Sequence, residues 1–325
     1  MKVRDNPPFP PPDSQLQVGE AAVGGADPHQ AAGAWPRQTK SLGQVATPQA
    51  VAELMARWVT SARPRTLLDP AAGLGSLLHE CYRLHRPARL VGVERDPETL
   101  RTARQTVPPG TRLIGADYLL CETGLFEGII ANPPYVKASR LEYPEGTWRA
   151  FEARFGTRLD RLTNLYALFL LKIWQDLAPR GRAAVLIPAE VLNANFGEEI
   201  KERLLQELRP VGLLVFAPTI NLFTDALTTS AIVFLEKNRP VTASLVATKA
   251  ESFAEAQQFA DHLLAPPGPK LGGSYRDLSR LKPQDKWLNL LFSYGPSEAP
   301  PLFAETVGNY FVCRRGIATG ANDFF

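Results

Sequence analysis

The sequence predicts an α/β fold, in which a doubly wound, mostly parallel sheet carries an antiparallel hairpin at one edge. Short apolar runs alternate with amphipathic helical stretches from residue 66 onward, which is the pattern of βαβ units. The last two apolar runs, at 211–217 and 229–237, are not separated by a helix long enough to connect parallel strands, so we expect them to form the hairpin. The 325 residues, 45% of them hydrophobic, are sufficient for one sizeable core and a second, smaller unit.

Local signals indicate each element in turn. The first helix begins at Thr47-Pro48, an N-cap residue followed by proline at the first helical position, and apolar residues from Val51 to Trp58 then recur at helical spacing. The stretch 164–177 is the most apolar of the later helices. The later helices are expected at 75–86, 97–107, 164–177 and 196–208, and the strands at 66–69, 89–94, 111–117, 128–131, 183–189, 211–217 and 229–237.

The chain divides into three parts by composition. Residues 1–41 are rich in Pro, Gly and Ala without periodicity, so we expect a disordered or loosely ordered segment. Residues 42–238 carry the alternating pattern and form the predicted folded domain. Residues 239–325 are interrupted by "APPGPKLGG" and end in "GIATGANDFF" without a helix or cap, which indicates a linker and the start of a region that continues further.

Composition also limits the cellular setting. The N-terminus has no apolar core of a signal peptide, and no run reaches the roughly 18 apolar residues that a membrane helix needs. The three cysteines form no CxxC pair, so neither a disulfide framework nor a zinc knuckle is indicated. We therefore expect a cytoplasmic protein without a membrane partner. The net charge of +3 does not by itself indicate a nucleic-acid partner.

Acidic residues stand at the ends of the first three predicted strands. Open α/β sheets bind ligands at this edge. Asp69 could hold an ammonium group there, Glu94 could accept hydrogen bonds from ribose hydroxyls, and Asp117 could accept from an adenine amine with the Tyr118 ring beside it. Each carboxylate alone could equally be a helix N-cap. Because Asn132 follows at the end of the fourth strand, we favour a binding site.

The loop after the first strand, "LLDPAAGLGSLL" (67–78), is rich in glycine. Gly73 and Gly75 allow the backbone to approach a ligand closely, and the following helix N-terminus favours negative charge. The loop is neither G-x-G-x-x-G nor a phosphate loop with Lys-Ser/Thr. A ligand without a polyphosphate is therefore expected.

The fourth strand leads into "NPPY". Pro133 and Pro134 lock two φ angles and remove two N–H donors, and Asn132 before them is restricted to an extended conformation. The segment is thus stiff, with bare carbonyls and with the Asn132 and Tyr135 side chains at fixed angles. This favours a pocket wall, and the alternative is a rigid turn at the exit of a strand.

Together these segments resemble an S-adenosylmethionine-dependent methyltransferase with a Rossmann-like sheet. The "NPPY" motif resembles that of N6-adenine DNA enzymes and of glutamine methyltransferases. Three further segments resemble gamma-class N6-adenine DNA methyltransferases of restriction-modification systems: "GQVATP" (43–48), "NLYALFLLK" (164–172) and "FTDALTTSAIVFLEK" (223–237). "RGIATGANDFF" (315–325) resembles the opening of their target-recognition region.

The resemblance implies roles for individual residues. Contacts to S-adenosylmethionine are implied for Gln44, Ala46, Thr47, Asp69, Ala71, Gly73, Gly75, Glu94, Asp117 and Tyr118. Catalysis is implied for Asn132, Pro133, Pro134, Tyr135 and Phe223, the last two stacking on a base removed from the duplex. Lys137 and Arg140 are candidates for phosphate contacts or, equally, solvated loop charges.

The resemblance also implies the reaction and its rivals. The expected function is methylation of the N6 amine of a flipped adenine in DNA, with a restriction nuclease or specificity region, on further chain or on a partner, as a candidate partner. The alternatives are a protein-glutamine or RNA N6-adenine methyltransferase, or a catalytically silent DNA-binding subunit. No metal is expected, because His79, Cys81 and His85 share one helix without a second ligand pair.

Overall fold

The fold was analysed in a computed structural model. It describes residues 46–135, 143–156, 164–194, 197–220, 222, 229–238, 246–265, 276–277 and 281–292. Four residues with expected roles lie outside this part, namely Gln44, Lys137, Arg140 and Phe223, as do the expected N-terminal segment 1–41 and residues 293–325. The chain divides into a first unit that ends at Leu291 and a second, Phe292–Phe325, of which only the first residue is described.

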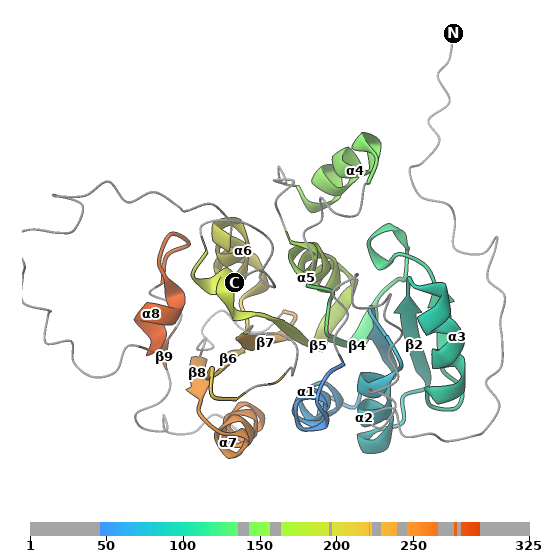
Figure 1. Ribbon diagram of the computed structural model, residues 1–325, viewed down its shortest axis with the longest axis horizontal. Helices are drawn as coiled ribbons and strands as arrows, with labels where there is room; N and C mark the ends of the chain where they lie inside the picture. Colours follow the sequence, from blue (N-terminus) through green and yellow to red (C-terminus); the bar gives the residue numbers. More distant parts are fainter. Residues whose placement is uncertain are drawn as a thin grey trace, which may run out of the picture. The chain divides into compact units, whose positions relative to one another are not determined.

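A nine-stranded sheet with the order β3-β2-β1-β4-β5-β7-β6-β8-β9 forms the centre of the first unit (Figure 1). The strands from β3 to β5 are all parallel, whereas β7 runs antiparallel to both β5 and β6. The doubly wound, mostly parallel class and the β6–β7 hairpin are therefore confirmed. The strands are β1 Thr66–Asp69, β2 Arg89–Glu94, β3 Arg112–Gly115, β4 Phe126–Ala131, β5 Leu177–Pro188, β6 Gly212–Phe216, β7 Ser230–Glu236, β8 Val246–Ala250 and β9 Arg276–Asp277.

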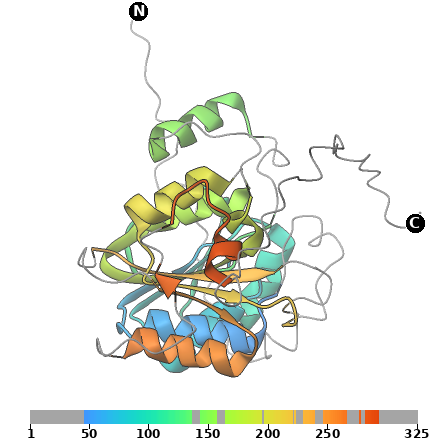
Figure 2. The ribbon, with the colours of Figure 1, turned by 90° about the vertical axis from the view of Figure 1, so that its left-hand side faces the viewer.

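Helices cover both faces of this sheet. In Figures 1 and 2, α1, α2 and α7 lie on one face, and α5 and α6 lie on the other. None of the helices in the described ranges is long and apolar enough to cross a bilayer. The α-helices are α1 Gln49–Thr60, α2 Ser76–Leu84, α3 Pro97–Thr106, α4 Glu145–Phe155, α5 Leu165–Asp176, α6 Glu198–Arg203, α7 Phe253–Leu264 and α8 Trp287–Phe292, with short 3-10 or π turns at η3 Tyr118–Leu120, η5 Ala189–Leu192 and η7 Leu204–Leu208.

The sheet extends beyond residue 238, where the sequence led us to end the domain. β8 adds to β6 in parallel, β9 pairs with β8, and α7 packs beside α1. The sequence does not indicate this extension because β8, "VATKA", has only one strongly apolar residue, so its strand conformation depends on pairing with β6 rather than on its own propensity.

The order of the strands determines where a ligand can bind. The chain builds β1, β2 and β3 outward, then returns to place β4 on the other side of β1. Crevices at such a reversal, outside the carboxyl ends of the strands, are the usual ligand sites of open α/β sheets. Asp69 ends β1, and Asn132 directly follows β4. The two groups of residues that the sequence singles out therefore meet at one edge.

Helix α1 is fixed against this sheet by polar as well as apolar contacts. The Trp58 indole N–H donates to the carbonyls of Ala183 in β5 and Leu235 in β7, at 3.1 and 3.3 Å. The Arg182 guanidinium lies 4.3 Å from the centre of the indole ring and also donates to the Ser61 hydroxyl. These contacts hold the C-terminal end of α1 at the start of the paired part of β5.

Candidate functional site

The loop after β1 is closed by carboxylates that accept backbone N–H groups. Asp69 Oδ1 accepts from Ala71 N at 3.0 Å. Glu94, at the end of β2, accepts from Gly73 N at 3.0 Å and from Asp96 N at 2.7 Å. The Glu94 carboxylate therefore fixes the loop to the neighbouring strand, a role that sequence reasoning did not assign to it.

Gly75 marks the point where this loop turns into α2. Its φ of +88° lies in the left-handed region, and a Cβ built on it would stand 2.6 Å from Val107 Cγ1. Both facts require glycine. The close approach expected of Gly75 is therefore made to the protein itself, at the residue that follows α3.

Asp69 is a buried carboxylate whose hydrogen bonding is incomplete. Its side chain is fully buried, and its Oδ2 has no hydrogen-bond partner among the described residues. Burial raises the pKa of Asp69 to about 7, and the nearby Glu94 adds to this increase while the Ala71 N–H opposes it. Buried carboxylate oxygens are normally satisfied. The free oxygen therefore has the chemistry to receive a cationic donor.

Asp117, which the sequence placed at the end of the third strand, follows β3 by two residues, and both of its carboxylate oxygens are engaged. It is the N-cap of η3, where its Oδ1 accepts from Leu119 N. Its Oδ2 accepts from the Tyr143 hydroxyl at 2.6 Å and lies 3.4 Å from Arg95 Nη1. Oδ1 therefore caps η3, whereas Oδ2, the oxygen left for a ligand, is already engaged by Tyr143 and Arg95. Sequence reasoning missed Tyr143, since it follows a segment without a recognisable motif.

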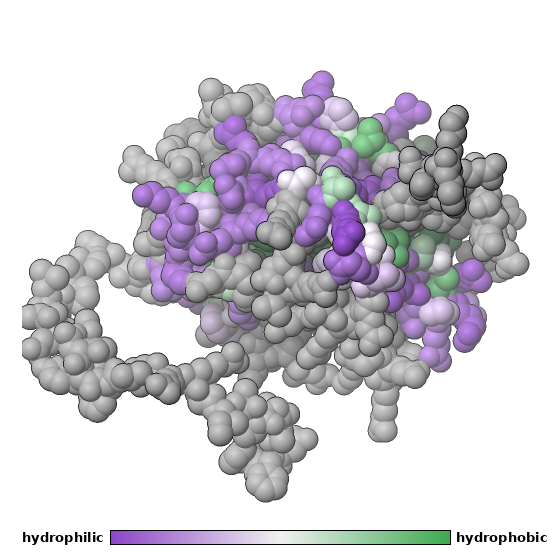
Figure 3. Space-filling model, turned by 90° about the horizontal axis from the view of Figure 1, so that it is seen from above, coloured by the Kyte–Doolittle hydropathy of each residue, from purple (hydrophilic) through white to green (hydrophobic). Residues whose placement is uncertain are grey.

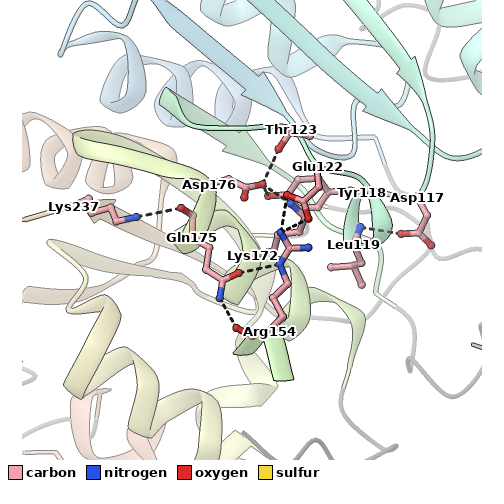
Figure 4. Close-up of polar contacts among 10 residues, drawn as sticks. All are labelled: Asp117, Tyr118, Leu119, Glu122, Thr123, Arg154, Lys172, Gln175, Asp176 and Lys237. Carbon is pink, nitrogen blue, oxygen red and sulfur yellow. Dashed lines mark hydrogen bonds and ion pairs between the residues drawn. The ribbon is translucent and has the colours of Figure 1, made fainter. Parts of the chain in front are cut away.

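Tyr118 does not occupy the position that the sequence led us to expect. The ring is 1% exposed and packs against Phe169, with Lys172 Nζ 4.4 Å from its centre. The hydroxyl donates to Asp176 Oδ2 at 2.9 Å (Figure 4). The side chain is therefore enclosed by protein, and its expected position beside a bound adenine stays a prediction.

Asp176 is the centre of a buried polar cluster that joins η3 to α5. Its Oδ2 also accepts from Thr123 at 2.8 Å and from Lys172 Nζ at 2.6 Å, all in the interior (Figure 4). Burial lowers the pKa of Lys172, while Asp176 counteracts this. The cluster thus holds the segment immediately after Asp117 in a fixed position.

The "NPPY" segment leaves the sheet directly after β4. The Asn132 Nδ2 donates to Thr47 Oγ1 at 3.0 Å, which connects the motif to the residue that precedes Pro48, the N-cap of α1. Pro133 is buried, and Pro134 is partly buried. The Tyr135 ring meets Tyr166 of α5 edge-on, with 6.4 Å between the ring centres, and burial raises the pKa of Tyr135. Sequence reasoning missed Tyr166, which lies within an apolar helix.

Two sets of predicted site residues are in contact in the structure. Glu94 at the end of β2 is hydrogen-bonded to the glycine loop after β1, and Asn132 is hydrogen-bonded to Thr47. Ala46 is partly buried just before Thr47. Within the described ranges, no group of three or more His, Cys, Asp or Glu side chains could hold a metal ion.

Comparison with known proteins places this architecture in a family. The N-6 DNA Methylase family model matches residues 34–108 and 111–262, more than half of the chain. The type II methyltransferase M.AccI of Acinetobacter calcoaceticus is 28% identical over 292 residues, covering 88% of this chain and 53% of that protein. M.XamI of Xanthomonas campestris pv. amaranthicola is 29% identical over 297 residues, covering 86% and 52%. The chain therefore spans about half the length of these curated relatives.

A solved structure resembles the fold. The methyltransferase subunit of a type I restriction-modification system from Streptococcus thermophilus aligns with a TM-score of 0.56 and 24% identity, over 67% of this chain and 52% of that chain. This likeness is consistent with the Rossmann-like fold that the motifs imply. The matched residues include the Gly-rich loop, Asp69, Glu94, Asp117 and "NPPY". The chain belongs to the N-6 DNA methylase family.

Proposed function

We propose that this chain transfers the methyl group of S-adenosylmethionine to the N6 amine of an adenine that has been flipped out of DNA, as the methylating part of a restriction-modification system. The observation that carries the proposal is that two features lie at the same edge of the sheet. One is the buried Asp69 carboxylate, with an oxygen that lacks a hydrogen-bond partner among the described residues, and the other is the Asn132 amide of the Asn-Pro-Pro-Tyr segment, oriented by Thr47. Family membership supports DNA as the substrate.

The residues present fit the cofactor. S-adenosylmethionine supplies a methyl group on a positively charged sulfonium, together with an ammonium group, ribose hydroxyls and an adenine amine. The unpartnered Asp69 Oδ2 suits the ammonium group, because a buried anionic oxygen without a donor is costly unless a cation reaches it. Glu94 at the next strand end would accept from ribose hydroxyls, and Asp117 from the adenine amine.

The catalytic segment acts by positioning. The adenine N6 amine is a weak nucleophile, because its lone pair is delocalised into the ring. The Asn132 side-chain oxygen and the Pro133 carbonyl would each accept one N–H of this amine, which favours a pyramidal nitrogen with its lone pair directed at the methyl group. The two prolines fix the orientation of the Pro133 carbonyl. The preorganised dipoles of this carbonyl and of the Asn132 amide would therefore activate the amine without a strong base. Tyr135 and Phe223 would stack on the extruded base.

The proposal is tested by following labelled methyl groups into single-stranded DNA, duplex DNA, RNA and protein. We expect N6-methyladenine in DNA, and we expect Asn132→Ala to abolish it while calorimetry still detects cofactor binding. Because glutamine methyltransferases share "NPPY", label found in protein alone would favour that activity instead. Cofactor binding without transfer to any substrate would favour a silent subunit. The same assay on RNA distinguishes the RNA N6-adenine alternative.

A further inference from the structure

The contact between Thr47 and Asn132 joins two segments that are 85 positions apart in the sequence. Thr47 is 4% exposed, and its Oγ1 accepts from the Asn132 Nδ2 at 3.0 Å. A carboxamide has a nitrogen end and an oxygen end of nearly equal shape, and its terminal torsion has only a broad, two-fold preference. A threonine hydroxyl can donate or accept, and in this structure it accepts from the nitrogen end, which turns the oxygen end away from it.

Helix α1 makes this contact rigid. Its 12 residues correspond to a length of about 18 Å, at 1.5 Å per residue. Trp58 and Ser61 fix its C-terminal end to β5, where Arg182 is opposite Gly128, the third residue of β4. Asn132 directly follows the last residue of β4. The helix thus runs along β4 from Gly128 toward Asn132, and only Pro48 separates Thr47 from its first residue.

We infer that Thr47 is a positioning residue for Asn132, and that it acts on the chemical step rather than on cofactor affinity. Its hydroxyl engages the amide nitrogen, so the amide oxygen is directed away from α1. In the proposed function, on which this inference rests, that oxygen is the acceptor for the reacting amine. This role differs from the cofactor contact that the sequence motif implies for Thr47.

The inference requires variants that change the hydroxyl and not the shape. Thr47→Val removes the hydroxyl at nearly constant volume, and Thr47→Ser retains it. Thr60→Val is the matched control, because Thr60 is on the same helix, is 7% exposed and uses its hydroxyl only within α1 in the described contacts, donating to Ala56 O. Thermal unfolding of each variant checks that α1 is intact.

A first readout does not depend on activity. The two side-chain amide protons of Asn132 are assigned in a nitrogen-correlated NMR spectrum as the pair lost in Asn132→Ala. We expect the pair to shift and to exchange faster with solvent in Thr47→Val, and to remain near its original position in Thr47→Ser and Thr60→Val. An Asn132 signal that is unaffected by Thr47→Val would overturn the contact itself.

The second readout separates kcat from cofactor binding. We expect Thr47→Val to lower kcat for methylation of single-stranded adenine substrates on the order of tenfold, the factor associated with one lost hydrogen bond to an oriented group. The calorimetric Kd for S-adenosylmethionine should change less than threefold, and Thr47→Ser should restore kcat. A weaker Kd with normal kcat at saturating cofactor would make Thr47 a cofactor ligand and refute the positioning role.

The two readouts also separate this inference from the proposed function. If the wild-type chain methylates no adenine substrate, the proposed function fails, and the catalytic role of Thr47 fails with it. If the wild type is active and Thr47→Val has the same kcat and Kd, the proposed function stands and only the positioning role is refuted.

Discussion

A buried carboxylate with one unsatisfied oxygen makes the stability of the protein depend on pH. The pKa of Asp69 is raised from 3.8 to about 7, chiefly by burial, and the groups that interact with it are Glu94 from β2 and Cys81 from α2. Between these two values the unfolded chain has released the proton and the folded chain has not. Folding is therefore less favourable as pH rises through this window, by at most about 1.4 kcal/mol per pH unit.

We predict that Asp69→Asn removes this cost in the absence of cofactor, because asparagine can still accept from Ala71 N but carries no charge. The gain in free energy of unfolding over wild type should grow from about pH 4 to 7 and then level off. Urea unfolding at several pH values measures it, with Asp261→Asn, a half-exposed partner of Arg57, as the control. A gain that shrinks as pH rises would contradict the assigned pKa direction.

At the scale of elements, the buried cluster around Asp176 ties η3 to α5. Removing one partner of a buried ion pair leaves a charge in the interior, at a cost of about 3–5 kcal/mol. We predict a loss of this size for Lys172→Met, since Lys172 is fully enclosed. The double variant Lys172→Met/Asp176→Leu should recover part of it, because no unpaired charge remains.

The control for this pair is Lys249→Met, because Lys249 forms a partly exposed ion pair with Glu251. Such pairs contribute about 0–1 kcal/mol. Guanidinium unfolding of all three variants measures the differences. Equal losses for Lys172→Met and Lys249→Met would show that the interior pair is no more important to stability than a surface one.

The contact between α4 and the Asp117 loop gives a second prediction at this scale. Tyr143, just before α4, donates to the Asp117 oxygen that is not used by the cap, and Arg154 of the same helix pairs with Glu122. If Asp117 accepts the adenine amine of the cofactor, Tyr143 competes for that oxygen. Tyr143→Phe should therefore bind S-adenosylmethionine about two- to tenfold more tightly, the range that one net hydrogen bond provides.

Calorimetric titration measures the affinity of Tyr143→Phe, and the fluorescence of Trp148, whose ring is 6.0 Å from that of Tyr143, reports whether α4 moves on binding. Tyr82→Phe, on α2, is the control. Weaker binding in Tyr143→Phe would mean that the hydroxyl supports the cofactor instead of competing with it.

At the scale of the whole molecule, charge and surface set the expected interaction with DNA. The net charge of +3 favours only a modest contribution from phosphate contacts, and this contribution falls as the salt concentration rises. On the described surface the large hydrophobic side chains that are well exposed are Leu84, Leu125 and Phe253, which lie on separate elements. The coloured part of the face in Figure 3 is correspondingly mostly hydrophilic.

We predict weak, salt-sensitive and sequence-poor binding to duplex DNA, with a preference for single-stranded or mismatched adenine. Stacking on Tyr135 and Phe223 would contribute on the order of 1–3 kcal/mol per base. Fluorescence anisotropy with duplex, mismatched and single-stranded probes at two salt concentrations measures this, and Tyr135→Ala should reduce the preference. Tight, sequence-selective duplex binding that persists at the higher salt concentration would be incompatible with this view.

The sequence was most informative where local pattern and tertiary structure agree. The strand ends at Asp69 and Glu94 follow from apolar runs that stop at a charged residue, whereas β3 ends at Gly115, two residues before the predicted Asp117. The alternation of elements predicts the common edge of these strands. It was least informative where a residue distant in the sequence determines the position of a side chain. Tyr118 follows Asp117 in sequence, yet its hydroxyl is hydrogen-bonded in the interior to Asp176, 58 positions away.

The same limit applies to whole elements and to the site. β8 is a strand because it pairs with β6. This pairing cannot be predicted from the short and weakly apolar sequence of β8. The role of Thr47 was assigned from the motif around it, and its partner Asn132 is known only once α1 is placed along β4. Single-residue chemistry was thus predictable from type and spacing, whereas the pairing of side chains required the fold.

The hydrogen bonds of Trp58 have a consequence for the order of events during synthesis. Its two acceptors lie 125 and 177 positions later in the chain. At about 5–20 residues per second, the ribosome completes the second acceptor roughly 9–35 s after Trp58. The strands β4 and β5, which also contact α1, are completed earlier, so what is missing until β7 emerges is the second of the two Trp58 hydrogen bonds. We therefore expect slower translation between β5 and β7 to increase the aggregation of nascent chains of this protein.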